Sequence, residues 1–93
     1  MVELTILYDY YSGLLTDKQR VYFEEYYFDN LSLQEISENN KISRNAVHKA
    51  IKEIENKLKY YEEKLELYSK RKKILNIIED IDKNKIEKIK ELI

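Results

Sequence analysis

Five polar side chains that could bind a nucleic acid lie within nine residues of the sequence. On an α-helix they would share one face: Arg44, Asn45, His48, Lys49 and Lys52. An arginine can donate two hydrogen bonds to guanine and an asparagine can pair with adenine, whereas lysines and the free amides at a helix N-terminus bind phosphate. The segment therefore predicts a nucleic-acid-binding helix, with Arg44 and Asn45 as the residues that read bases.

The rest of the sequence offers little for catalysis or metal binding. His48 is the only histidine and cysteine is absent, so a His/Cys metal site or a thiol nucleophile cannot form. The adjacent carboxylates Glu24–Glu25 and Glu62–Glu63 would point about 100° apart on a helix. No glycine-rich phosphate loop is present. We therefore expect no enzymatic activity, no metal ion and no cofactor.

The residues around this face have the pattern of a helix-turn-helix motif. A short helix begins at Leu33 and ends near residues 38–40, and a second helix begins at Ser43 after a tight turn. The apolar positions suit two helices that cross at a steep angle: Leu33, Ile36, Ile42, Val47, Ile51 and Ile54. The second helix of such a motif usually enters the major groove of DNA. The alternative is a motif kept as a packing module or a protein-docking surface.

Two positions depart from the usual form of the motif. Ser37 stands where a small alanine usually lets the two helices approach. Lys41 stands at the turn position that usually holds glycine, so either Lys41 or Asn40 must adopt the left-handed backbone conformation that side chains disfavour. Neither substitution excludes the motif.

Charge is distributed unevenly along the 93 residues, although the net charge is only −1. Residues 1–40 contain eight acidic and two basic residues, whereas residues 41–75 contain eleven basic and five acidic residues. The basic block includes the predicted recognition helix, as expected of a nucleic-acid-binding protein. Because the composition is biased toward Lys, Ile, Asn and Tyr, Arg44 is a stronger signal than the lysines.

Helix starts are marked by hydroxyl side chains, and the absence of proline with a single glycine indicates an all-α protein. The expected caps are Thr16 with Gln19, Ser32 with Glu35, and Ser43. A first helix is expected from about Val2 to Ser12, with Gly13 as its C-terminal capping residue. The helix that follows Thr16 should end at Asp29–Asn30.

The second helix of the motif has no stop signal for several turns. Its apolar positions alternate steps of four and three residues, as in a coiled-coil seam: Val47, Ile51, Ile54, Leu58, Tyr61, Leu65 and Tyr68. The first three would pack on the preceding helices. The last four extend more than about 15 Å beyond Val47, too far for those helices. We expect these four residues to form the dimerisation surface of a homodimer, or to be covered by the terminal helix folded back.

Beyond Lys72 the apolar positions shift to Ile74, Ile77, Ile78 and Ile81. Residues 82–84 are expected to break the helix before a last amphipathic helix with Ile86, Ile89, Leu92 and Ile93 on its apolar face. The pattern predicts a helix-turn-helix domain over residues 1–57 and a long-helix extension with a terminal helix over residues 58–93, through which the chain dimerises.

The start of the sequence lacks a basic segment followed by a long apolar run, so no secretory signal is expected. No stretch approaches the roughly 20 apolar residues that span a bilayer. We expect a cytoplasmic protein with no membrane insertion.

Several motifs resemble those of the YlxM family: LLTDKQ at 14–19, YYFD at 26–29, LSLQEIS at 31–37, SRNAV at 43–47 and YEEKL at 61–65. The resemblance covers about residues 4–70. It implies a helix-turn-helix similar to region 4 of sigma factors, in a regulator that binds DNA. It also implies a connection with the signal recognition particle pathway, whose partners would be an RNA or a GTPase.

Overall fold

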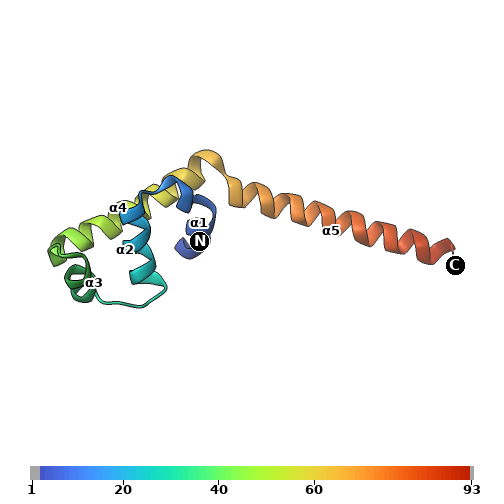
Figure 1. Cartoon of the computed structure of the whole chain (residues 1–93). Helices are drawn as coiled ribbons and strands as arrows, with labels where there is room; N and C mark the ends of the chain where they lie inside the picture. Colours follow the sequence, from blue (N-terminus) through green and yellow to red (C-terminus); the bar gives the residue numbers. More distant parts are fainter. Residues whose placement is uncertain (1–2, 93) are drawn as a thin grey trace.

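The computed structural model describes residues 3–92 of the chain, and it describes side chains for residues 3–80. Over that range the protein is helical and contains no strand. The elements are α1 (Leu4–Tyr11), a 3₁₀ helix (Ser12–Leu14), α2 (Asp17–Tyr27), α3 (Leu33–Asn40), α4 (Arg44–Leu65) and α5 (Leu67–Leu92). Figure 1 shows α1, α2 and α3 gathered along α4, while α5 extends away from them. The predicted all-α helix-turn-helix bundle is confirmed.

Capping hydrogen bonds explain why α2, α3 and α4 begin where they do. The Thr16 hydroxyl accepts the Gln19 amide at 3.2 Å, and the Gln19 side chain accepts the Thr16 amide at 3.0 Å. Ser32 and Glu35 form the same reciprocal pair at α3. The Ser43 hydroxyl accepts the Ala46 amide at 3.1 Å at the start of α4. Each cap satisfies amide groups that have no partner within the helix. The three predicted starts are confirmed.

The end of α1 differs from the prediction. Gly13 does not take the left-handed conformation of a C-terminal cap, because the chain tightens into the 3₁₀ helix in which the Leu15 amide bonds the Ser12 carbonyl at 3.1 Å. This tightening satisfies backbone groups at the helix end. It also turns Leu15 into the core, where 4% of the residue is exposed.

Helix α4 is the centre of the core, and α1, α2 and α3 all pack on it. Its buried side chains recur at steps of four and three residues: Val47, Ile51, Ile54 and Leu58. Aromatic rings fill the space toward α1 and α2, where the Phe23 ring stacks on those of Tyr8 and Tyr27 with 4.4 Å between centroids. Burying each of these large side chains stabilises the fold by about 1.5–3 kcal/mol.

The predicted long helix is interrupted after Leu65. Glu66 adopts a left-handed conformation (φ 52°, ψ 33°), so α4 ends there and α5 begins at Leu67. The seam from Val47 to Tyr68 is therefore not continuous. The inference that Leu58 needs a partner outside the N-terminal helices is also wrong, because α1 packs over this part of α4 and leaves Leu58 fully buried.

A set of hydrogen bonds fixes the bend between α4 and α5. The Glu62 carboxylate accepts the Tyr11 hydroxyl at 3.1 Å and the Tyr68 amide at 3.0 Å. The Tyr11 hydroxyl in turn accepts the Leu67 amide at 3.0 Å. These bonds satisfy two of the free amides at the start of α5 and join them to α1. We call this arrangement of Tyr11, Glu62 and the first amides of α5 the elbow.

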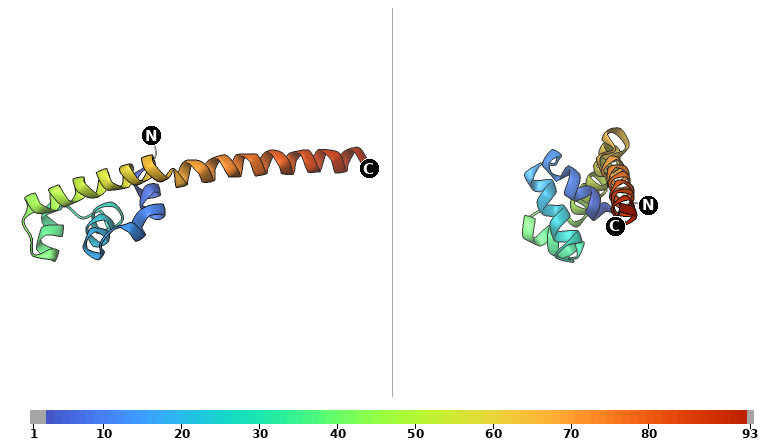
Figure 2. Two further views of the ribbon diagram at one scale, coloured as in Figure 1. Left: turned by 90° about the horizontal axis from the view of Figure 1, so that it is seen from above. Right: turned by 90° about the vertical axis from the view of Figure 1, so that its right-hand side faces the viewer.

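Helix α5 is unbroken from Leu67 to Leu92, so the break expected at residues 82–84 is wrong. Asp, Lys and Asn cost less than about 1 kcal/mol each inside a helix, and no proline or glycine is present to end it. The helix does not fold back on α4 but extends from the elbow (Figures 1 and 2), and the molecule measures 68 × 26 × 21 Å. The predicted apolar face at Ile81 and beyond lies outside the described side chains.

Candidate nucleic-acid interface

The turn between α3 and α4 is formed as its sequence requires. Lys41 has left-handed angles (φ 55°, ψ 43°), which confirms that Lys41 or Asn40 must adopt them. The amides of Lys41 and Ile42 both donate to the Ser37 carbonyl, the latter at 3.1 Å, and so close the end of α3. The Asn40 side chain donates to the Ile36 carbonyl at 2.8 Å. The turn is therefore well bonded without glycine.

Apolar side chains from the two motif helices hold α3 against α4. Ile36, Val47 and Ile51 form a buried cluster, with Leu31, Leu33, Ile42, Tyr22 and Tyr27 packed against it. Ser37 is also buried at this contact, with 5% of the residue exposed, and its hydroxyl donates to the Gln34 carbonyl at 2.7 Å. Serine therefore fits the close approach of the helices because its only polar group is satisfied.

All five predicted nucleic-acid-binding residues are exposed on the first turns of α4. We call this surface, Arg44, Asn45, His48, Lys49 and Lys52, the basic face. Val47 and Ile51 lie between these residues in the sequence but point into the core, so they fix the orientation of the basic face relative to the bundle. The structure thus brings the five residues together on one side of one helix.

The electrostatics of the basic face favour an anion. No acidic residue occurs between Arg44 and Lys52, and the first turn of α4 holds no acid, whereas the first turns of α2 and α3 hold Asp17 and Glu35. The positive end of the α4 dipole is therefore not compensated by a carboxylate in its own first turn. Within the described residues Lys52 pairs with Glu55 at 3.5 Å, while Arg44 and Lys49 make no ion pair.

The four residues predicted to mediate dimerisation do not form one open surface. Leu58 is fully buried, and Tyr61 packs on the same cluster beneath α1. Tyr68 is half-buried against the Tyr10 ring, at 5.8 Å between centroids, and Leu65 is 42% exposed. A second copy in contact with this segment stays a prediction.

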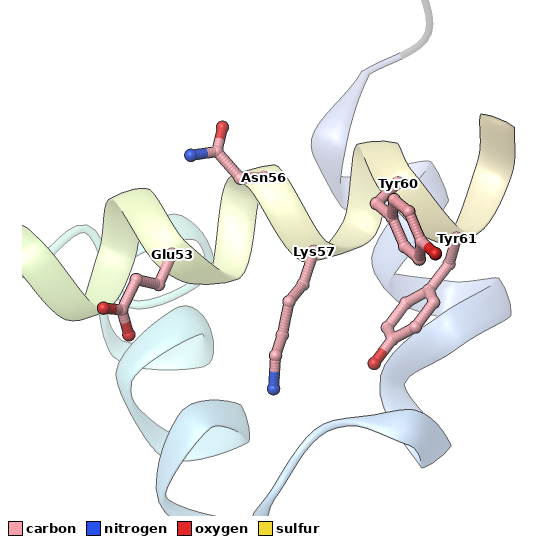
Figure 3. A pocket seen from close by; sticks show the side chains of 5 residues that line it. All are labelled: Glu53, Asn56, Lys57, Tyr60 and Tyr61. Carbon is pink, nitrogen blue, oxygen red and sulfur yellow. The ribbon is translucent and has the colours of Figure 1, made fainter.

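A groove farther along α4 was not predicted from the sequence. It has a volume of about 520 Å³ and is lined by Glu53, Asn56, Lys57, Tyr60 and Tyr61 (Figure 3). The adjacent tyrosines Tyr60 and Tyr61 were its signal in the sequence. The groove begins after Lys52 and shares no residue with the basic face.

The fold and the basic face define a helix-turn-helix protein with a long C-terminal helix. Over residues 1–93 the chain matches the family UPF0122, described as "Putative helix-turn-helix protein, YlxM / p13 like", and it belongs to that family. In the described residues, no helix combines the length and the apolar character needed to cross a membrane.

Relatives from several bacteria show the same similarity over most of the chain. A UPF0122 protein of Caldanaerobacter subterraneus subsp. tengcongensis is 50% identical over 90 residues, which cover 97% of this chain and 70% of that protein. One from Clostridium botulinum is 48% identical over 84 residues, covering 86% and 77%. One from Geobacillus is 42% identical over 101 residues, covering 98% and 92%.

Proposed function

We propose that this protein is a cytoplasmic, non-enzymatic regulator that binds DNA through the basic face of α4. The observation that carries the proposal is the gathering of five exposed polar residues on the first turns of a capped helix that has no acid there. The motif packing supports it, since α3 is fixed against α4 in the manner of a helix-turn-helix. Family membership supports the motif and leaves its ligand open.

Each residue of the basic face has a role that its chemistry suits. Arg44 and Asn45 lie at the start of α4, where a recognition helix contacts base edges, and they would read guanine and adenine. Lys49 and Lys52 would bind phosphates together with the first amides of α4. His48 lies between these two groups and would face the major groove of the DNA or a phosphate.

The proposal is tested by measuring the affinity of the chain for duplex DNA and for structured RNA at several salt concentrations. We expect binding that weakens steeply as salt rises, because phosphate contacts release counterions. Arg44→Ala should weaken binding to a preferred sequence by about 1–3 kcal/mol. Lys49→Ala should reduce the slope of log K against log salt by about 0.9 on duplex DNA.

Lys57→Ala is the matched control, because it removes the same charge from the same helix. Lys57 is exposed but lies at the groove, where its amine is 3.5 Å from the Gln19 side chain. Its loss should leave the salt slope near that of the wild type. Equal effects of Lys49→Ala and Lys57→Ala would contradict a defined basic face, and a higher affinity for RNA would assign the face to RNA.

A second candidate function is that of an accessory protein that docks on another protein. Helix α2 and the loop after it expose Glu24 and Asp29 beside Phe28, which is 49% exposed. Asp17 forms an ion pair with Arg20, and the Glu25 carboxylate accepts a hydrogen bond from the Asn40 side chain, so both acids already have partners within the chain. The resemblance to YlxM makes a basic GTPase of the signal recognition particle the expected partner.

A pull-down in high salt with nuclease separates the two functions. A protein partner that survives this treatment and is lost with Glu24→Lys, but not with Arg44→Ala, would favour docking. Loss of all partners under the same conditions would favour nucleic-acid binding.

A further inference from the structure

Helix α5 carries apolar side chains that nothing in the described part of the chain covers. Ile74, Leu75, Ile77 and Ile78 are between 46% and 58% exposed. Ile74, Ile77 and Ile78 follow steps of three and four residues, which place them on one face, and Leu75 lies at its edge. A helix that extends alone into water derives little stability from its own propensity. We therefore expect this apolar face of α5 to pack against a partner.

The sequence around this face is complementary to its own reverse. Counted from Asn76 in both directions, Ile74 corresponds to Ile78 and Leu75 to Ile77. Continuing outward, Lys73 corresponds to Glu79 and Lys72 to Asp80. Apolar positions thus correspond to apolar positions, and basic positions correspond to acidic positions.

We propose that α5 pairs with α5 of a second copy in antiparallel orientation, about a two-fold axis near Asn76. A two-fold contact uses the same surface of both chains, so the surface must complement its own reverse. The segment from Lys72 to Asp80 meets that condition in both hydrophobicity and charge. The two apolar faces cover each other. Lys73 and Asp80 flank this face on the same side of the helix, so Lys73 of each copy lies beside Asp80 of the other, whereas Lys72 and Glu79 lie on the outer side.

Charge also decides the orientation of the pair. In a parallel pair the block Lys70–Lys73, which holds four basic residues, would lie beside its own copy. Eight positive charges would then gather within about a Debye length of one another, which is 8–10 Å at ordinary salt. The antiparallel pair instead places Lys73 and Lys72 of this block level with Glu79 and Asp80 of the other copy. This inference does not depend on the proposed DNA binding.

The first test measures dimerisation by sedimentation equilibrium of the full chain. Wild type should be a dimer, and K72E/K73E and E79K/D80K should each weaken self-association at least about tenfold, because each replaces the Lys73–Asp80 pairs across the two-fold with like charges. An equimolar mixture of the two variants should recover dimerisation, because positions 73 and 80 are both acidic in one variant and both basic in the other, and so carry opposite charges across the two-fold. The quadruple variant K72E/K73E/E79K/D80K should recover it alone. Circular dichroism checks that each variant remains helical.

The second test measures orientation with introduced cysteines, since the chain has none of its own. In an antiparallel pair, the Lys70 residues of the two copies lie about 18 Å apart along the helix axis. That distance exceeds the reach of a disulfide, so K70C should not oxidise to a covalent dimer. A mixture of I74C with ¹⁵N-labelled I78C should form the mixed disulfide in excess over either self-disulfide.

Several outcomes would overturn the proposal. They are a monomeric wild type, a dimer whose association neither charge variant changes, and efficient oxidation of K70C, which indicates a parallel pair. Wild type that is monomeric but forms a mixed complex with another helical protein would assign the face to that protein.

Discussion

At the scale of single residues, Lys41 shows how the motif is maintained without its usual glycine. A side chain in the left-handed region costs about 1–2 kcal/mol because its Cβ approaches the backbone. Two interactions offset this cost. The Lys41 and Ile42 amides donate hydrogen bonds to the Ser37 carbonyl at the end of α3, and Ile42 packs on the cluster of Ile36, Val47 and Ile51. The position of the basic face thus depends on a strained residue next to it.

Lys41→Gly should stabilise the protein. Glycine removes the left-handed cost, and its greater freedom in the unfolded chain offsets part of the gain. We expect the free energy of unfolding to rise by about 0.5–1 kcal/mol, measured by urea denaturation. Lys49→Gly is the control, because Lys49 lies within α4 and the same change there should lower that free energy by about 0.5–1 kcal/mol. A lower stability of Lys41→Gly would show that the turn is not strained.

At the scale of elements, the elbow joins the first helix to the last. Tyr11 is 1% exposed, and its hydroxyl donates to Glu62 and accepts the Leu67 amide. The Arg71 guanidinium also donates to the neighbouring Tyr10 hydroxyl at 3.3 Å. The direction of α5 is therefore set by α1, which lies far away in the sequence.

Tyr11→Phe should destabilise the protein by about 1–3 kcal/mol, because it leaves the Leu67 amide without its acceptor and removes one of the donors to the Glu62 carboxylate at a partly buried site. Urea denaturation measures the loss, and hydrogen exchange should show a faster Leu67 amide. Tyr10→Phe removes a hydroxyl with an exposed hydrogen bond, so we expect a change within about 0.5 kcal/mol. Equal effects of both substitutions would contradict the role of Tyr11.

The packing of α1, α2 and α4 around tyrosines also predicts a loss of stability at alkaline pH. Burial, as the largest cause, raises the pKa of Tyr8, Tyr11 and Tyr27 above 10, and nearby Glu24, Glu62 and Glu55 raise it further. The folded state therefore holds protons that the unfolded chain releases above pH 10. This contribution to stability is complete below pH 10 and is lost as pH rises through the folded pKa values.

The free energy of unfolding should fall above pH 10, with a slope approaching about 1.4 kcal/mol per pH unit for each such tyrosine. Urea denaturation from pH 8 to about pH 11 measures it. Tyr27→Phe should make the fall shallower. Tyr60→Phe should not, because Tyr60 is 55% exposed. A pH dependence that Tyr27→Phe leaves unchanged would contradict the assignment.

At the scale of the whole molecule, the protein is far more extended in space than a compact domain with the same number of residues. Its radius of gyration is 19.8 Å, whereas a compact domain of this length would have one of about 12 Å. The bundle carries the basic face at one end of α4, and the elbow at the other end directs α5 away from the bundle (Figure 2). Pairing of α5 would therefore join two bundles without covering either basic face.

Hydrogen exchange at two protein concentrations should separate the two parts. Amides of α4 from Val47 to Leu58 should exchange slowly at both concentrations, because the core of each chain protects them. Amides of α5 around Asn76 should exchange quickly in dilute solution and more slowly in concentrated solution, because only the second copy protects them. Protection of α5 that does not change with concentration would contradict this account.

Much of the motif could be predicted from local sequence. The caps at Thr16, Ser32 and Ser43 bond to groups three residues away, and the missing glycine of the turn limited the left-handed residue to Asn40 or Lys41, of which the structure selects Lys41. The apolar spacing of Ile36, Val47 and Ile51 predicted their shared cluster for the same reason. These features depend on neighbours along the chain, so the sequence alone determined the helix starts, the turn and the exposure of the basic face.

Only the tertiary structure decided what covers the distal half of α4 and where α5 points. The spacing of Leu58 and Tyr61 along the helix indicates a buried face but does not show which segment covers it. That segment is α1, which lies about 50 residues earlier in the sequence. The bend at Glu66 has no glycine or proline to announce it, and it is formed by bonds from Tyr11 and Glu62. Contacts between distant segments depend on the path of the whole chain, so no local pattern specifies them.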